Sequence, residues 1–216
     1  MRLLILGASG KVGTWLTRLA VERGHDVVAV VRSPTAVGAN GRTRVAIGSV
    51  LDEEFLFRVL EGRDAVASCL GLRRAGKWPW AKLLSPPNLT ELVTRKLVPA
   101  METAGVQRLV TISAGGVGDS IHQLTRPVRA TLSMGTLGLA YADLERMEAV
   151  LRGSTLDWLA VRPVTLVNGA PTGRAGKVQR FGLFSAVRRA DVAAWMLERL
   201  EHPGRFGEHT VLLGTT

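Results

Sequence analysis

The sequence predicts an α/β fold: a doubly wound, mainly parallel sheet with helices on both faces. Short, continuous apolar runs alternate along its 216 residues with stretches of helical period, as buried parallel strands and their covering helices require. A glycine-rich turn separates the first apolar run from the first helical stretch. No repeat or low-complexity segment interrupts this alternation, so we expect residues 1–216 to form a single domain.

The first 70 residues predict four strands and two helices. A helix over 11–23 carries an apolar face that includes Val12, Leu16 and Ala20, and a shorter helix covers 52–60. The strands are continuous apolar runs at Arg2–Leu6, 27–31, Thr43–Ile47 and 64–70.

The rest of the chain repeats the alternation after an irregular segment. Residues 72–87 are rich in glycine, proline and tryptophan and predict a loop. We expect Asn88 to cap the helix that follows and Gly105 to end it. The remaining predicted elements are helices at 88–104, 141–152 and 190–200 and strands at 108–113, 156–161 and 210–213.

Composition and charge exclude several classes of protein. The longest apolar runs have only a handful of residues and the N-terminus lacks a signal peptide, so we expect a cytoplasmic protein without a membrane span. Cys69, the only cysteine, predicts a core residue and no disulfide, and no cluster of metal ligands is apparent. The net charge of +10 comes from scattered Arg and Lys without a nucleic-acid-binding motif, so no specific nucleic-acid partner is expected.

The glycine turn predicts a binding site for a dinucleotide. It follows a strand and opens a helix, the context in which such a motif is meaningful. Gly7 permits the sharp turn, Gly10 lets the backbone approach a pyrophosphate, and Gly13 lets the helix press onto the sheet. The free amides of the first helical turn attract phosphate, so we expect a Rossmann-type, NAD(P)-binding domain.

The end of the second strand indicates which cofactor is preferred. A carboxylate there would bind both ribose hydroxyls and select NAD, but the chain has Arg32 and Ser33 instead. Arg32 can pair with a 2′-phosphate and stack on adenine, and Lys11 adds a second cation nearby. We therefore expect NADP(H) to be preferred, with NAD(H) as the alternative.

Several segments together resemble a known family. The glycine turn, Arg32 with its neighbours, and the segments at 69–71, 111–114 and 160–163 occur in the order found in atypical short-chain dehydrogenases/reductases. Within that group the chain is similar to the NAD(P)H-binding, NmrA-like proteins, including biliverdin and flavin reductases. The similarity runs over nearly the whole chain.

The resemblance implies further cofactor contacts. It places residues 48–50 at the adenine, although Ser49 stands where the family usually has Asp. It places 69–71 beside the adenosine ribose and bridging phosphates, and 163–166 over the nicotinamide carboxamide. The expected cofactor-binding residues are Gly7, Ala8, Ser9, Gly10, Lys11, Val12, Arg32, Ser33, Ser49, Val50, Cys69, Leu70, Gly71, Ser113, Pro163, Val164, Thr165 and Leu166.

Ser113 and Tyr141 are the candidate catalytic residues. Classical members of the superfamily use a Ser and a Tyr with a Lys four residues later, but this chain has Glu145 at that position. A carboxylate beside the phenol would favour its neutral form and raise its pKa, which is the opposite of what a general base requires. Ser113 lies where a strand ends and is expected to contact either the carboxamide or the substrate.

Two functions remain open at this point. A site poor in catalytic groups suits an NADPH-dependent oxidoreductase that passes hydride to a flat acceptor such as a flavin or quinone, since these can take a proton from water. The alternative is a non-enzymatic NADP(H) sensor of the NmrA-like kind. The substrate region is expected in the loops 72–87, 115–140 and 164–189, where Trp78 and Trp80 either stack on an aromatic acceptor or form a lid. The protein is expected to be a monomer or a small homo-oligomer.

Overall fold

The large sheet organises the whole structure. A computed structural model describes residues 1–33, 41–76, 78, 80–126, 129, 132, 134–182 and 184–216. Within these residues an eight-stranded sheet has the order β3-β2-β1-β4-β5-β6-β10-β8, parallel throughout except where β8 pairs with β10. Its strands are β1 (Arg2–Leu6), β2 (Asp26–Val31), β3 (Thr43–Ile47), β4 (Ala65–Ser68), β5 (Arg108–Ile112), β6 (Asp157–Pro163), β8 (Ala175–Lys177) and β10 (Thr210–Thr215).

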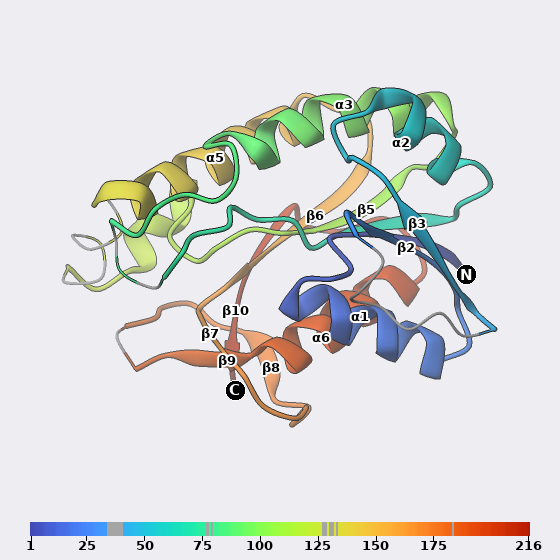
Figure 1. The fold of residues 1–216 in the computed structure, drawn as a ribbon. Helices are drawn as coiled ribbons and strands as arrows, with labels where there is room; N and C mark the ends of the chain where they lie inside the picture. The colour runs from blue at the N-terminus through green and yellow to red at the C-terminus, as the bar shows by residue number, and fades with distance from the viewer. Residues whose placement is uncertain are drawn as a thin grey trace.

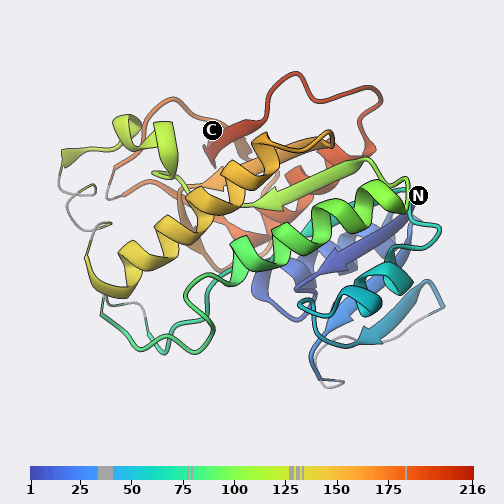
Figure 2. The same ribbon diagram turned by 90° about the horizontal axis from the view of Figure 1, so that it is seen from above.

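Helices cover both faces of this sheet. In Figure 1 the helices α2, α3 and α5 lie above it and α1 and α6 below it. Seen from above, α3 and α5 run side by side across the sheet (Figure 2). These helices are α1 (Lys11–Glu22), α2 (Glu53–Leu60), α3 (Leu89–Thr103), α5 (Gly135–Arg152) and α6 (Arg189–Glu201). The predicted doubly wound fold is therefore confirmed.

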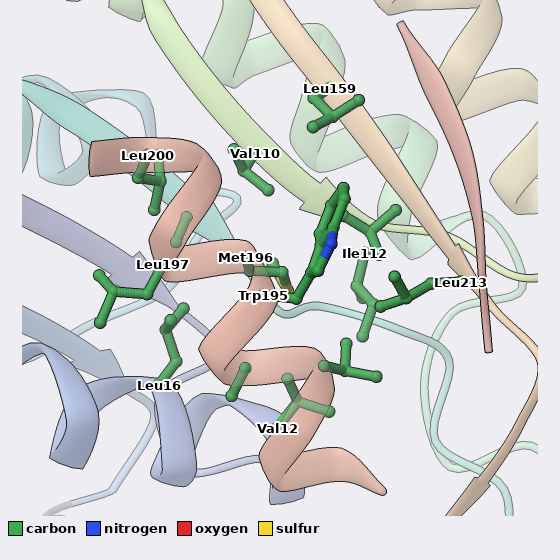
Figure 3. Packing of buried hydrophobic residues seen from close by; sticks show 14 of the residues in the cluster. Val12, Leu16, Val110, Ile112, Leu159, Trp195, Met196, Leu197, Leu200 and Leu213 are labelled. Atoms are coloured by element: carbon green, nitrogen blue, oxygen red, sulfur yellow. The ribbon is translucent and has the colours of Figure 1, made fainter. Parts of the chain in front are cut away.

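Two apolar cores lie between the sheet and its helices. Successive residues of a strand point to opposite faces, so Leu3 and Ile5 enter one core while Leu4 and Leu6 enter the other. Figure 3 shows the first core, in which Trp195 and Met196 of α6 and Val12 of α1 pack under the central strands. Apolar side chains on both faces explain why the strands read as continuous apolar runs in the sequence.

The parallel register places the ends of neighbouring strands together. Leu6 of β1 is paired with Val30 of β2 and with Ser68 of β4, so the carboxyl ends of these three strands meet at one edge of the sheet. β5 and β6 end nearby in the same direction, with Ile112 paired with Val161. Ligands bind at this edge in open α/β sheets, so we expect the binding site of this protein here.

One helix cap differs from the prediction. Asn88 precedes α3 but its side chain makes no capping hydrogen bond. The carboxylate of Asp143 on α5 accepts instead from the backbone N–H groups of Thr90 and Glu91, both at 3.0 Å, and from the Thr90 hydroxyl at 2.6 Å. The free amides of α3 are thus satisfied from another helix, which no local pattern around Asn88 indicates.

The second half of the chain contains elements that the sequence did not predict. α5 begins at Gly135, six residues before the expected start. A 3₁₀ helix, η1 (Gly118–Gln123), follows β5, and a two-stranded parallel ribbon joins β7 (Thr165–Val167) to β9 (Ala186–Arg188). β8 is likewise an unpredicted strand. Among the helices of the described residues, none is long and apolar enough to cross a membrane.

Candidate functional site

The glycine turn brings bare backbone to the edge of the sheet. Gly7 has a φ of +73°, a left-handed conformation that favours glycine, and its carbonyl accepts the Gly10 amide at 2.9 Å. Gly10 immediately precedes α1 and makes no side-chain capping bond, so the first amides of the helix have no capping partner from that residue. A Cβ on Gly13 would collide with the Gly7 carbonyl oxygen, so only glycine at this position permits the close approach of α1 to the turn.

A pocket of about 310 Å³ opens beside this turn. Its wall comes from the carboxyl ends of β1, β2 and β4 and from the segments that follow β3 and β4. A Cβ on Gly7 would lie 3.0 Å from the Cys69 carbonyl oxygen, so the backbone of the glycine turn and the backbone after β4 lie close together beside the pocket. The expected cofactor residues that line it are Gly7, Ser9, Gly10, Arg32, Ser49, Val50, Cys69, Leu70 and Gly71.

Arg32 is the expected cation among the residues that line this pocket. It follows β2 directly and is exposed, and no carboxylate is among the residues that line the pocket with it. The Ser49 hydroxyl accepts the Leu51 amide at 3.2 Å and so stabilises the turn after β3. The pocket therefore combines backbone donors with a positive charge, the chemistry that binds phosphate groups.

The other expected cofactor residues lie outside this pocket. Ala8 and Val12 are buried in the core, while Ser33 is exposed after Arg32. Lys11 lines a separate, shallow hollow together with Ser9 and Arg189. Residues 163–166 run from the end of β6 into β7; Pro163 and Val164 are buried and Thr165 is exposed.

Sequence reasoning missed residues on the opposite wall of the pocket. Arg73 lies two residues beyond Gly71, and the chain returns later to place Leu84, Ser85 and Pro86 against the same space. An arginine so soon after a strand end was a usable signal, because strand ends form the site in such sheets. The return of Leu84–Pro86 depends on the path of the loop, which the sequence does not display.

Ser113 is tied to a buried ion pair. It follows β5, and its hydroxyl donates to Glu148 Oε1 of α5 at 2.6 Å. Arg162 of β6 donates to the same carboxylate through Nε at 3.0 Å and Nη2 at 2.6 Å. The side chains of Glu148 and Arg162 are only 1% and 3% exposed, so each buried charge needs compensation, which the other supplies at 2.6 Å.

Arg162 also connects this pair to the surface. Its Nη1 donates to Asp119 Oδ1 of η1 at 2.6 Å, although the Asp119 side chain is 81% exposed. Burial alone would raise the pKa of Asp119, but the hydrogen bond and the charge of Arg162 outweigh it and lower that pKa below its usual value. Arg162 therefore holds η1 against the ends of β5 and β6.

Tyr141 lines a second, more open hollow of about 640 Å³. Val117, Ile121 and Leu132 contribute apolar surface to it, and Glu145, Arg126 and Arg129 contribute charge. Burial raises the pKa of Tyr141 to about 12, and the nearby charge of Arg74 opposes this only in part. The expectation of a raised pKa holds, but burial and not Glu145 is the cause.

Trp78 and Trp80 stack on each other. Their ring centroids are 6.2 Å apart with planes at 17°, and they are 71% and 66% exposed. Neither lines the pocket beside the glycine turn or the hollow at Tyr141. Among the described residues, no group of three or more His, Cys, Asp and Glu side chains is placed to hold a metal ion.

Comparison with known families shows to which family the chain with this glycine-turn pocket belongs. The model of a family described as NAD(P)H-binding matches residues 7–203, which include the glycine turn and the elements from α1 to α6. The chain belongs to this NAD(P)H-binding family. The dinucleotide inferred from the glycine turn is therefore of the NAD(P)H type.

The similar proteins and solved structures share about a quarter of their residues with this chain. An uncharacterised chloroplast protein of Arabidopsis thaliana is 26% identical over 80% of this chain, which spans only 61% of that protein. The oxidoreductase ptaF of Pestalotiopsis fici is 25% identical over 97% of this chain and 83% of its own length. Among solved structures, the anaerobilin reductase ChuY of Escherichia coli O157:H7 has a TM-score of 0.77 and 27% identity, over 99% of this chain and 96% of that one.

Proposed function

We propose that this protein is an NADPH-dependent reductase that transfers hydride to a flat, aromatic or quinonoid acceptor such as a flavin or a quinone. The observation that carries the proposal is the pocket in which the bare glycine turn meets the guanidinium of Arg32. Membership of the NAD(P)H-binding family supports the cofactor. The names of two similar proteins, an oxidoreductase and an anaerobilin reductase, support reduction as the reaction class.

In this proposal the pocket holds the adenosine end of NADPH. The first amides of α1 receive the pyrophosphate, because a glycine precedes that helix and leaves these donors without a side-chain cap. Arg32 pairs with the 2′-phosphate and stacks on adenine, beside Ser49 and Val50. Arg73 lines the same space and adds a second guanidinium. Residues 69–71 pass the ribose, and 163–166 cover the carboxamide.

The acceptor is assigned to the hollow that Tyr141 lines. When bound, the reduced nicotinamide supplies a hydride, and a flavin or quinone takes its accompanying proton from water. The protein therefore has to position a flat molecule and exclude bulk solvent, for which the apolar side chains of Val117, Ile121 and Leu132 are suited. The raised pKa of Tyr141 keeps its phenol neutral at this wall.

The test is NADPH oxidation with a panel of flavins and quinones, followed at the reduced-nicotinamide absorbance. Wild-type protein, Arg32→Ala and the control Arg18→Ala are each measured with NADPH and NADH. Arg18 is exposed on α1 and pairs with Glu22. We expect Arg32→Ala to weaken NADPH binding about ten- to hundred-fold, as loss of charge-assisted hydrogen bonds does, with NADH and the control almost unaffected.

Each outcome bears on a separate part of the proposal. Equal losses for NADPH and NADH in Arg32→Ala would contradict recognition of the 2′-phosphate. Tight NADPH binding without turnover of any acceptor would favour the NADP(H) sensor over the enzyme. Absence of binding to either dinucleotide would remove the proposal altogether.

A further inference from the structure

The buried carboxylate of Glu148 determines what the Ser113 hydroxyl can do. Two N–H groups of Arg162 donate to the two Glu148 oxygens, so this side chain is a carboxylate with acceptor capacity only. Glu148 also forms a longer ion pair with Arg152, at 3.9 Å, and the 2.6 Å contact between Ser113 Oγ and Glu148 Oε1 must therefore be donated by the serine. A hydroxyl has one proton, and that proton is already used.

The Ser113 oxygen consequently has only lone pairs left for a hydrogen bond with any further group. It lies next to the end of β6, because its own amide donates to the Val161 carbonyl at 2.7 Å and the Gly115 amide donates to the Pro163 carbonyl at 2.9 Å. Residues 163–166 are the segment to which the proposed function assigns the nicotinamide carboxamide. A carboxamide offers N–H donors, which match an oxygen that can only accept.

We propose that Glu148 is a positioning residue: it holds the Ser113 proton, and Ser113 thereby accepts a hydrogen bond from the N–H₂ group of the nicotinamide carboxamide. The inference rests on the proposed function, since it requires the nicotinamide beside residues 163–166. With its proton committed to Glu148, the hydroxyl gives no hydrogen bond to a carbonyl oxygen of the acceptor.

A buried ion pair with a purely structural role would place no demand on the cofactor, and this difference can be measured. Calorimetry compares the Kd of NADP⁺ with that of its 3-acetylpyridine analogue, in which a methyl group replaces the amide nitrogen. The ratio of the Kd of the analogue to the Kd of NADP⁺ reports hydrogen bonds made by that nitrogen. We measure it in wild-type protein, Ser113→Ala, and the double variant Glu148→Leu with Arg162→Leu.

The double variant removes both buried charges together. Replacing a buried ion pair by apolar side chains is often tolerated, whereas removing one partner leaves an uncompensated charge. Arg2→Gln with Asp64→Asn is the matched control, because this ion pair, at 2.6 Å, lies at the opposite edge of the sheet. Thermal melting of each variant establishes that it is folded before its ratio is compared.

We expect the ratio to fall about five-fold in Ser113→Ala, the effect of one hydrogen bond, and to fall similarly in the double variant. The control should keep the wild-type ratio. A double variant that is folded and keeps the wild-type ratio overturns the role of Glu148. A wild-type ratio equal to that of Ser113→Ala overturns the contact itself.

Should the double variant not fold, Glu148→Asp serves in its place. It retains the charge that Arg162 needs but is one methylene too short to hold the Ser113 hydroxyl at the same distance. The ratio should again fall, and an unchanged ratio in folded protein counts against the proposal. If wild-type protein does not bind NADP⁺ at all, the proposed function fails, which is a different result from binding without discrimination.

Discussion

Tyr141 shows at the scale of one residue how burial limits chemistry. Burial raises the pKa of its phenol to about 12, so the group carries its proton throughout the physiological range. A general base would have to lose that proton near neutral pH. Tyr141 is therefore suited to contact an acceptor or to donate a hydrogen bond, and not to abstract a proton.

The titration of Tyr141 can be followed directly, because it is the chain's only tyrosine. We expect tyrosinate absorbance to develop near pH 12 in native protein and near pH 10 in denatured protein. The unfolded state then loses its proton first, so the stability contributed by this group is complete below pH 10 and disappears between pH 10 and 12. Tyr141→Phe should abolish the signal, and a native midpoint near 10 would contradict burial of the phenol.

At the scale of elements, the cap of α3 links two helices of one layer. Asp143 of α5 is fully buried and accepts three hydrogen bonds from Thr90 and Glu91. These include two of the amides that a helix start leaves without intrahelical partners. The contact therefore holds the start of α3, which borders the glycine-turn pocket at Leu89, against α5.

Replacing Asp143 by Ala should lower the free energy of unfolding by about 3 kcal/mol, since it leaves buried donors without acceptors. Urea denaturation measures the change. Glu145→Ala is the control, because Glu145 is an exposed carboxylate on the same helix, and it should cost less than about 0.5 kcal/mol. Equal losses in the two variants would show that the three hydrogen bonds contribute little.

These elements also show what the sequence could and could not predict. Strands buried on both faces are continuous apolar runs, and α1 has a clear apolar face, so the large sheet and its helices were predictable. β7, β8 and β9 have three residues each and mostly half-buried or exposed side chains, too little for a pattern. The cap by Asp143 joins residues more than 50 positions apart, which local rules at Asn88 cannot reveal.

The candidate site likewise has one part that the sequence could predict and one part that it could not. Gly7, Arg32 and Cys69 follow or end strands, and the parallel order of the sheet was sufficient to expect them around one pocket. The wall formed by Leu84–Pro86 and the contact of Ser113 with Glu148 depend on tertiary packing between distant segments. The sequence shows the residue types in these contacts but not their proximity.

At the scale of the whole molecule, the net charge of +10 acts on any anionic ligand. NADPH carries one phosphate more than NADH, so its binding should depend more strongly on ionic strength. We expect the affinity for NADPH to fall more steeply than that for NADH as sodium chloride is raised from low concentration to about 1 M, where the screening length is about 3 Å. Calorimetry across this range measures both slopes, and parallel slopes would show that the charge does not favour the extra phosphate.

The place of β10 in the sheet has a consequence for synthesis on the ribosome. β10 is the last described strand in chain order, yet it lies between β6 and β8. A nascent chain that has just completed β6 at Pro163 must wait for β10 to begin at Thr210, roughly 2–10 seconds at ordinary rates of translation. Throughout that interval the edge of β6 that later pairs with β10 presents unpaired backbone groups. Such an edge can pair with another chain, so we expect this stage of synthesis to be prone to aggregation.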